Sequence, residues 1–524
     1  MSQGNGGSPH QRVVVIGLEA AEPTLVEQWA NEGKLPTFQS LMQKGIWRRL
    51  RSTTEISSGA TWASLITGTN PAKHGMGFYH RQLQPGTYTI RKKYAEQTAT
   101  EPFWNQLSRH GKRVAILDLP DTYATEDLNG VMLVGWGAEG LNAKQHSWPK
   151  KLLKDIFSRV GHHPLEFWYQ ERPKDIAAWK AFSDKLLEGT RRRTQIAKQV
   201  LAQEAWDCYV IGYAEAHWIG HYFWHIIDKR HPDYDPELER ECGDSILKIY
   251  QEIDRGIAEL ITMSPEATVM IVSNTGMGPN FSGQHLLPQV LEKLGYSKGP
   301  SSAGLKQLLP HQKWGPYYAI KSIETLVSAK LMETIKRVIP EKVWDSVTRR
   351  ILTMGNNWKD SLAFEVPSDY SGAIRINLKG REPHGLVEPG GEFDHLCARI
   401  TQDLLELVNP DTGEGAVAGV IKVKDVYQGD RLDEMQDLIV QWKGNAPVNH
   451  LESKKIGRVS GILPDKRSGA HMVNGFMLAA GRSIKTNQQL EDAHIMDIAP
   501  TLLHVLSEPI PDIMDGKVLS DILS

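Results

Sequence analysis

The sequence has few cysteines and no long apolar run. Only three cysteines occur among 524 residues, which argues against a disulfide framework or a cysteine-based zinc site. No window approaches the roughly 18 to 20 apolar residues that a membrane-spanning helix needs. Residues 1–11 are rich in Gly, Ser and Gln and lack the basic and apolar regions of a signal peptide. We therefore expect a cytoplasmic protein with a short disordered tail and no membrane partner.

The chain also lacks an excess of charge of either sign. Lys and Arg number 60 against 62 Asp and Glu, which gives a formal net charge of -2. No overall field therefore favours a nucleic-acid polymer, and an anionic small molecule would have to be bound locally. At 524 residues the chain can bury a large core of its own.

Short β-branched segments alternate with helical patterns. Residues 12–17 have the character of a buried parallel strand, and 113–119, 208–212 and 268–273 share it. A helical pattern covers residues 244–263, between the last two of these segments. Such alternation predicts an α/β fold with a mostly parallel central sheet flanked by helices on both faces.

Polar residues follow three of these strands directly. Glu19 follows the first strand, a histidine-rich segment begins after 208–212, and Asn274 and Thr275 follow 268–273. Ligands of open α/β sheets bind beyond the carboxyl ends of the strands. We therefore expect the three groups to meet in one crevice.

Three histidines, His217, His221 and His225, recur at every fourth residue. On a helix they would lie along one face, where two of them could hold a metal ion. The alternative is an aromatic helix side with core imidazoles, and we assign His225 to such packing. A third ligand is needed, and His471, in a turn-like loop before a predicted strand, is the candidate. By spacing alone other histidines, such as His74, have the same claim.

Small hydroxyl residues precede a helical pattern in residues 52–68. A serine at a helix start lies beside the positive end of the helix dipole and its free N–H groups, which suits a nucleophilic oxygen or an anion. The alternative is an ordinary N-cap. On this pattern alone capping is favoured, because Ser and Thr are common capping residues.

Taken together, these segments resemble the alkaline phosphatase superfamily, specifically its type I phosphodiesterase/nucleotide pyrophosphatase branch. The resemblance extends from Val13 to the C-terminus. It rests on segments that follow in family order: 17–19, 33–36, 52–75, 376–383, 467–475 and 497–516. It implies an alkaline phosphatase-like domain over residues 12–524, with insertions at about 149–203 and 286–369 that look like surface or lid material.

The resemblance also implies a chemistry. Family members use two metal ions, commonly zinc, on either side of a Ser or Thr nucleophile that forms a covalent intermediate. Ser58 falls on the nucleophile position. One ion would be held by His217, His221 and His471. The residues implied for the second ion are Glu19, Ser58, Asn274 and Thr275.

This chain departs from the family pattern at both metal sites. The family expects Asp at positions 19, 217 and 274 and His at position 275. Three imidazoles are still a good zinc set with an open fourth position. The second site loses a charge and its best nitrogen ligand, so we expect it to be weak or empty, with Glu215 and His285 as possible substitute ligands. The sequence therefore supports one divalent ion, most fittingly zinc, better than two.

Three functions remain compatible with the sequence. The first is a metal-dependent hydrolase of phosphate mono- or diesters, or of a related phosphonate or sulfate ester, acting through a Ser58 intermediate. The second is a phosphoryl-type transferase or a single-metal enzyme of altered chemistry. The third is a catalytically silent binding scaffold, because fold alone does not imply activity. In the first two cases the expected partner is a small phosphate-type ester.

Overall fold

The computed structural model describes residues 11–53, 58–77, 81–137, 145–165, 172–299, 357–366, 368, 370–486 and 492–524. The predicted tail, apart from residue 11, and most of the predicted insertion at 286–369 lie outside these residues. None of the described helices is long and apolar enough to cross a membrane.

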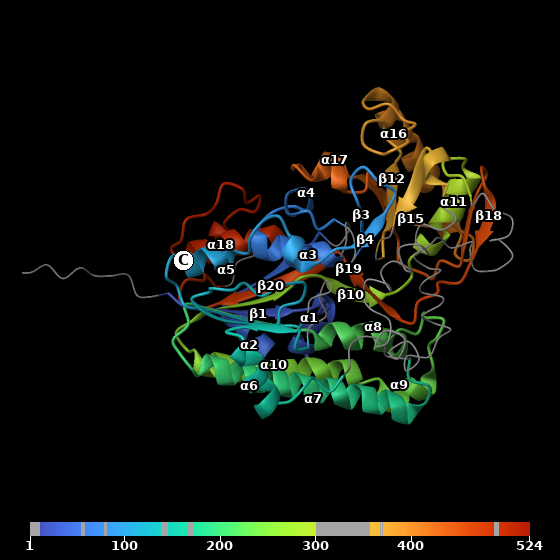
Figure 1. Cartoon of the computed structure of the whole chain (residues 1–524). Coiled ribbons are helices and arrows are strands. Elements are labelled where there is room, and N and C mark those ends of the chain that lie inside the picture. Colours follow the sequence, from blue (N-terminus) through green and yellow to red (C-terminus); the bar gives the residue numbers. More distant parts are fainter. Residues whose placement is uncertain are drawn as a thin grey trace, which may run out of the picture.

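A nine-stranded sheet forms the centre of the molecule (Figure 1). Its central strands run parallel, and antiparallel pairs occur only toward the edges, so the predicted mostly parallel sheet is confirmed. The strands lie in the order β21 (Ala493–His494), β2 (Ile46–Arg51), β20 (Asn474–Ala480), β9 (Thr268–Ser273), β1 (Val13–Leu18), β8 (Cys208–Tyr213), β5 (Val114–Leu117), β6 (Gly130–Val134) and β7 (His146–Trp148).

Helices cover both faces of this sheet (Figure 1). Along β1 the side chains alternate, so Val14 and Ile16 pack into one hydrophobic cluster while Val13 and Val15 pack into the other. The first face carries α1 (Pro23–Asn31), α2 (Pro36–Lys44), α6 (Lys151–Arg159), α7 (Ile176–Leu201), α8 (Glu215–Ile227), α9 (Pro236–Cys242) and α10 (Ser245–Met263). The second face carries α3 (Ser58–Thr67), α5 (Phe103–Arg109) and α18 (Ile498–Val505), with the short α4 (Pro71–His74) following α3.

The expectation of surface or lid material at 149–203 is wrong for α7. Trp179, Leu186 and Val200 of this helix are buried in the cluster beneath the sheet, and α7 packs along α10. Most of the charged residues that suggested a surface segment lie on its outer side, as does Lys198, which pairs with Glu259 on α10, whereas Arg193 is buried. This amphipathic helix thus buries one stripe and keeps most of its charges in water.

A second, antiparallel sheet lies beside the main one (Figure 1). Its strands lie in the order β11 (Ala363–Val366), β12 (Gly372–Ile376), β16 (Leu438–Trp442) and β15 (Val417–Lys422). Three helices accompany it: α11 (Leu287–Lys293), α16 (Gly391–Leu405) and α17 (Val423–Val426). Three further sheets are made of short strands. One contains β14 (Glu414–Gly415), β13 (Val408–Asn409), β17 (His450–Ser453) and β18 (Gly457–Ser460). The other two are the pairs β3 (Arg81–Leu83) with β4 (Ile90–Lys92) and β10 (Gly276–Pro279) with β19 (Gly469–Met472).

Candidate active site

The carboxyl ends of four strands meet at one edge of the main sheet. β8 and β9 run parallel to β1. β2 is antiparallel to β20, which is itself antiparallel to β9, so β2 also ends at this edge. The segment after β2 leads into α3, which begins at Ser58. The predicted crevice residues therefore follow strands that end side by side.

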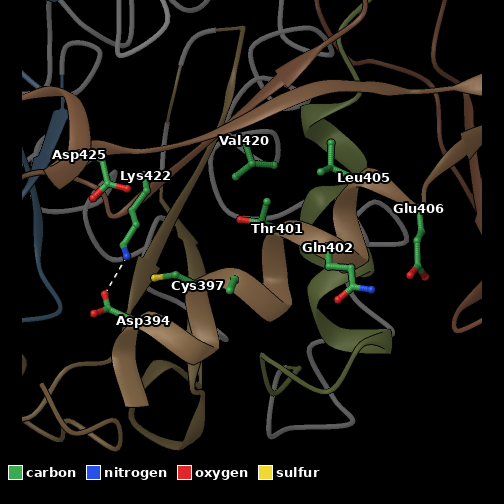
Figure 2. A pocket seen from close by; sticks show the side chains of 10 residues that line it. Asp394, Cys397, Thr401, Gln402, Leu405, Glu406, Val420, Lys422 and Asp425 are labelled. Atoms are coloured by element: carbon green, nitrogen blue, oxygen red, sulfur yellow. Dashed lines mark hydrogen bonds and ion pairs between the residues drawn. The ribbon is translucent and has the colours of Figure 1, made fainter. Parts of the chain in front are cut away.

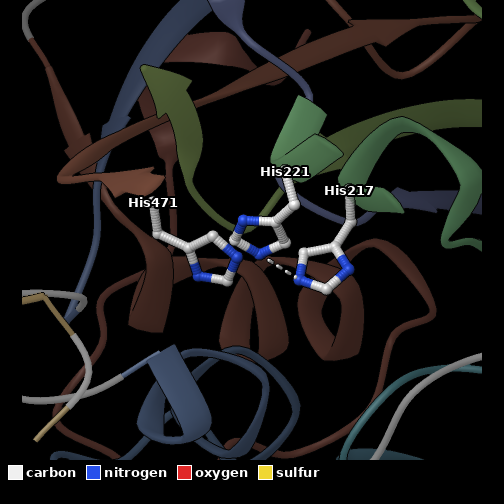
Figure 3. Close-up of side chains that lie close together, drawn as sticks. All are labelled: His217, His221 and His471. Atoms are coloured by element: carbon white, nitrogen blue, oxygen red, sulfur yellow. Dashed lines mark hydrogen bonds between the residues drawn. The ribbon is translucent and has the colours of Figure 1, made fainter. Parts of the chain in front are cut away.

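Three histidines form a cluster at this edge (Figure 3). His217 and His221 lie on successive turns of α8, and His471 comes from β19. One ring nitrogen from each lies within 4.8 Å of the others, and His217 Nε2 is 2.8 Å from His221 Nε2. The three predicted ligands of the first ion are thus brought together, and all three are buried.

His471 lies in a strand and not in a turn-like loop as expected. β19 pairs antiparallel with β10, so that His471 is opposite Met277. β10 begins directly after Asn274 and Thr275. The antiparallel pair of β10 and β19 therefore brings His471 back beside the end of β9. The sequence signal, a glycine-containing segment before a strand, did not reveal the pairing because β19 has only four residues.

The hydrogen bonds of the cluster leave nitrogen lone pairs available for a cation. His221 Nδ1 donates to the carbonyl oxygen of Gly469 at 2.7 Å, so its Nε2 carries the lone pair that faces His217. Within the described residues, neither ring nitrogen of His471 has a hydrogen-bond partner. A buried imidazole without a partner is costly unless an ion or water satisfies it. The donor set and its arrangement therefore fit a zinc ion.

The surroundings keep the imidazoles of His221 and His471 uncharged. Burial, helped by His217 and Arg467, lowers the pKa of His221 well below its ordinary value. Burial and the charge of Arg467 lower the pKa of His471 to about 3. Neutral imidazole is the form that binds a metal, so the site is prepared for a cation at neutral pH.

Glu19 and Asn274 also come together, but they bind each other. The Asn274 amide nitrogen donates to Glu19 Oε1 at 3.2 Å and to Thr61 Oγ1 at 2.8 Å. Trp62, the next residue of α3, donates its indole N–H to Glu19 Oε2. The backbone N–H of Ala20, a residue with a φ of 50°, donates to Asn274 Oδ1 at 3.0 Å. This set of groups does not fit a second divalent ion as it stands, because its one carboxylate is already surrounded by donors.

Thr275 interacts with the antiparallel pair of strands β10 and β19. Its hydroxyl donates to the carbonyl oxygen of Met472, the residue after His471. The hydroxyl therefore joins the end of β9 to β19 and supports the position of His471. As a metal ligand Thr275 remains a prediction.

The two possible substitute ligands lie in other surroundings. Glu215, at the start of α8, accepts hydrogen bonds from Arg193 Nε at 2.9 Å and from His163 Nε2 at 3.2 Å. Burial works to raise the pKa of Glu215, but Arg193 and His163 outweigh it and hold the pKa below its ordinary value. His285 bonds through Nε2 to the carbonyl oxygen of Gly461 at 3.1 Å. Neither belongs to the histidine cluster found among the described residues.

His225 packs as expected. Its Nδ1 lies 3.1 Å from Ser468 Oγ, and its ring contacts the ring of Trp179 with centroids 5.2 Å apart. It faces α7 and the segment before β19 and takes no part in the cluster.

Arg467 and Tyr370 lie beside the cluster, and the sequence did not single them out. The Arg467 guanidinium lies over the Tyr370 ring at 5.3 Å, and the centroid of that ring is 5.5 Å from that of His471. Arg467 also pairs with Asp465 at 2.9 Å. Because Arg467 is four residues before His471, the family-like segment 467–475 could have indicated it. Tyr370 carries no such sequence signal.

Ser58, the predicted nucleophile, begins α3, and its side chain lies outside the described part of the structure. A second serine of α3, Ser64, contacts His74, with Oγ 2.9 Å from Nε2. The Met76 N–H donates to His74 Nδ1, so Nε2 carries the proton and donates to Ser64. Burial and the nearby Lys93 lower the pKa of His74 to about 3. His74 therefore cannot take a proton from Ser64, and this pair is structural.

A hollow of about 610 Å³ lies over the second, antiparallel sheet, between α16 and β15 (Figure 2). Burial raises the pKa of its cysteine, Cys397, to about 12, which makes the thiol unreactive at neutral pH. Its Lys422 pairs with Asp394 at 2.7 Å. The hollow therefore offers no catalytic group, whereas the histidine cluster does.

Residues 13–461 match the family described as type I phosphodiesterase/nucleotide pyrophosphatase. The chain belongs to this family. The predicted resemblance and the prediction of a phosphodiesterase- or phosphatase-type hydrolase are confirmed at this level, since enzymes of the family hydrolyse phosphoesters. No curated protein matched the sequence significantly.

Solved structures of the alkaline phosphatase superfamily have the same fold. A phosphonoacetate hydrolase from Sinorhizobium meliloti 1021, in complex with phosphonoformate, has a TM-score of 0.52 at 12% identity, covering 95% of this chain and 96% of its own. A mutant of the alkaline phosphatase PafA has a TM-score of 0.50 at 13% identity, with coverages of 99% and 100%. Human ectonucleotide pyrophosphatase/phosphodiesterase 5 has a TM-score of 0.47 at 14% identity, with coverages of 98% and 100%. The first two likenesses support the fold, and at such identities none carries a substrate over to this chain.

Proposed function

We propose that this protein hydrolyses small phosphate mono- or diesters, or a related phosphonate or sulfate ester, with Ser58 as nucleophile and one divalent ion at His217, His221 and His471. The observation that carries the proposal is the buried convergence of these three imidazoles at the sheet edge where β2, the strand before α3, also ends. Zinc suits three nitrogen ligands with an open fourth position. When bound, the ion supplies a Lewis acid that favours the charge developing on a phosphoryl oxygen.

The chain's own groups have separate roles in this proposal. Ser58 Oγ attacks the phosphorus atom as the bond to the ester oxygen breaks, and the alcohol leaves with the proton that the serine gives up. Water then cleaves the serine ester in a second displacement, and the positive end of α3 favours the negative charge on the phosphoryl oxygens. The hydrogen bond from His221 to Gly469 holds the imidazole in the tautomer that presents Nε2. Arg467 contributes a positive charge near the cluster that favours an anionic substrate. A cytoplasmic location stays a prediction, and the three described cysteines, all unpaired and buried, are compatible with it.

A transferase is the second candidate, because it would use the same serine nucleophile as the hydrolase. A covalent serine intermediate can be intercepted by an alcohol in place of water. Product analysis with added glycerol or methanol separates the two, because a transferase yields the phosphorylated alcohol as the main product. The silent scaffold requires that no turnover occurs with any phosphate, phosphonate or sulfate ester.

The test compares Ser58→Ala with Ser57→Ala, a matched control that removes the neighbouring hydroxyl. Both are assayed on a chromogenic aryl phosphate, an aryl phosphodiester and an aryl sulfate, with zinc present. We expect Ser58→Ala to lose at least about 100-fold in kcat, since the nucleophile is removed, and Ser57→Ala to stay within a few-fold of wild type.

Full activity in Ser58→Ala would contradict the assignment of the nucleophile. Activity unchanged after complete removal of metal by a chelator would contradict the metal centre. Wild-type protein that binds zinc but turns over none of these ester classes would favour the scaffold over the hydrolase.

A further inference from the structure

The orientation of the Asn274 amide is fixed by a backbone group. Ala20 N can only donate a hydrogen bond, so the atom that faces it at 3.0 Å must be the amide oxygen. The amide nitrogen therefore faces Glu19 and Thr61. An amide nitrogen is a donor without a usable lone pair, so this side of Asn274 cannot bind a cation.

Two N–H groups stabilise the charge of Glu19 as a cation would. Its Oε1 accepts from Asn274 and its Oε2 accepts from Trp62. Hydrogen bonds to a buried carboxylate stabilise its charge, because donors replace the water it has lost. Glu19 is only 7% exposed, so it needs such partners.

We propose that Asn274, with Thr61 and Trp62, replaces the second metal ion of the family, so that this protein is a single-metal enzyme. Thr61 and Trp62 both belong to α3, whereas Glu19 and Asn274 follow β1 and β9. The network therefore fastens the helix that begins at Ser58 to the ends of two central strands. The inference rests on the proposed function only in taking Glu19 and Asn274 as the counterparts of the family's second site.

A single change should reverse the replacement. In Asn274→Asp an oxygen would occupy the place of the nitrogen that now lies 3.2 Å from Glu19 Oε1. Two carboxylates at such a distance cannot both remain ionised unless a cation or proton lies between them. The variant should therefore recruit a second ion that the wild type does not need.

The experiment counts ions. Purified wild type, Asn274→Ala and Asn274→Asp are stripped with a chelator, dialysed against zinc and measured by elemental analysis, and their Tm is followed during a zinc titration. We expect one ion per chain in the wild type and in Asn274→Ala. We expect a second ion in Asn274→Asp, with a Tm that continues to rise past one equivalent of zinc.

The matched control is Asn377→Asp, at the residue that directly follows β12 of the second, antiparallel sheet. Asn377 is equally buried, and its amide nitrogen donates to the carbonyl oxygens of Trp358 and Ser361, with no carboxylate in the set. This variant should have a lower Tm that zinc does not restore past one equivalent. Recovery of its Tm by zinc would show that the response is not specific to position 274 and would overturn the inference.

Two ions in the wild type, one of them lost in Asn274→Ala, would overturn the inference. An unchanged ion count and zinc response in Asn274→Asp would do the same. A wild type that holds no ion at the histidine cluster contradicts the proposed function instead. In that case Asn274→Asp still decides the inference, since it gains an ion only if the amide stands in place of one.

Discussion

The two halves of the candidate site, the histidine cluster and the Glu19–Asn274 group, lie at one edge of one sheet, yet their side chains are arranged in opposite ways. In the histidine half, ring nitrogens from α8 and β19 converge, and two of the facing atoms are both Nε2. In the Glu19 half, each acceptor faces a donor, and the amide of Asn274 lies at the centre. One half has groups that need a cation, and the other has groups that satisfy one another. A position in the fold therefore does not determine its chemistry; the number of lone pairs and N–H groups does.

The largest expected effect comes from removing His471, the ligand that the tertiary structure brings beside His217 and His221. His471→Ala should abolish the bound ion and lower metal affinity by more than the roughly 10- to 100-fold that loss of an outer-shell partner costs. Elemental analysis and zinc titration measure this. His225→Ala is the matched control, because His225 lies one turn beyond His221 and bonds to Ser468. Loss of the ion in His225→Ala, or its retention in His471→Ala, would contradict the assignment of the histidine half.

The second prediction concerns the buried ionic cluster behind the histidine half. Arg193 bonds to Asp118 and to Glu215, and all three side chains are almost fully buried. Arg193→Met should lower the free energy of unfolding by about 3–5 kcal/mol, because two carboxylates lose their buried partner. Urea unfolding measures it.

Arg191→Met serves as the control for this variant. Arg191 lies two residues earlier on α7 and pairs with Glu252, but its side chain is half exposed. We expect a change of about 1 kcal/mol or less, as for other exposed pairs. Equal losses in the two variants would mean that the Arg193 cluster does not anchor the start of α8.

The smallest effect is expected in the Glu19 half. Trp62→Phe removes the N–H that donates to Glu19 and should cost about 1.5–3 kcal/mol, the usual range for a hydrogen bond to a charged group. The number of bound ions should not change. Trp104→Phe is the control, since Trp104 is fully buried and its indole N–H has no hydrogen-bond partner among the described residues. If Trp104→Phe costs as much as Trp62→Phe, the loss reflects ring volume and not the hydrogen bond.

Much of the main sheet could be predicted from the sequence. The segments at 12–17, 208–212 and 268–273 became β1, β8 and β9 because continuous β-branched runs suit strands that are buried on both sides. The assignment of later strands to sheets could not be predicted. β12, β15 and β16 lie between strands of the main sheet in the chain, but they belong to the antiparallel sheet, and α17 follows β15 directly.

The candidate site, too, could be predicted from the sequence only in part. His217 and His221 could be paired from their spacing, since residues four apart share a helix face. The place of His471 before a predicted strand made it a candidate, but spacing did not distinguish it from other histidines, because its strand is short and its partner strand, β10, lies almost 200 residues earlier. Arg467 and Tyr370 also meet beside His471 from distant parts of the chain, since Arg467 precedes β19 and Tyr370 precedes β12.

By itself the sequence determined that Glu19, Asn274 and Thr275 follow strands of one sheet, and that four of the family's metal ligands are replaced. Only the tertiary structure decided what the replacements do. It turns the Asn274 oxygen toward Ala20 and its nitrogen toward Glu19, because a backbone N–H can only donate and a buried carboxylate must be hydrogen-bonded. Local spacing encodes which residues reach the edge of the sheet, whereas the direction of each hydrogen bond depends on partners that folding brings together from far apart in the chain.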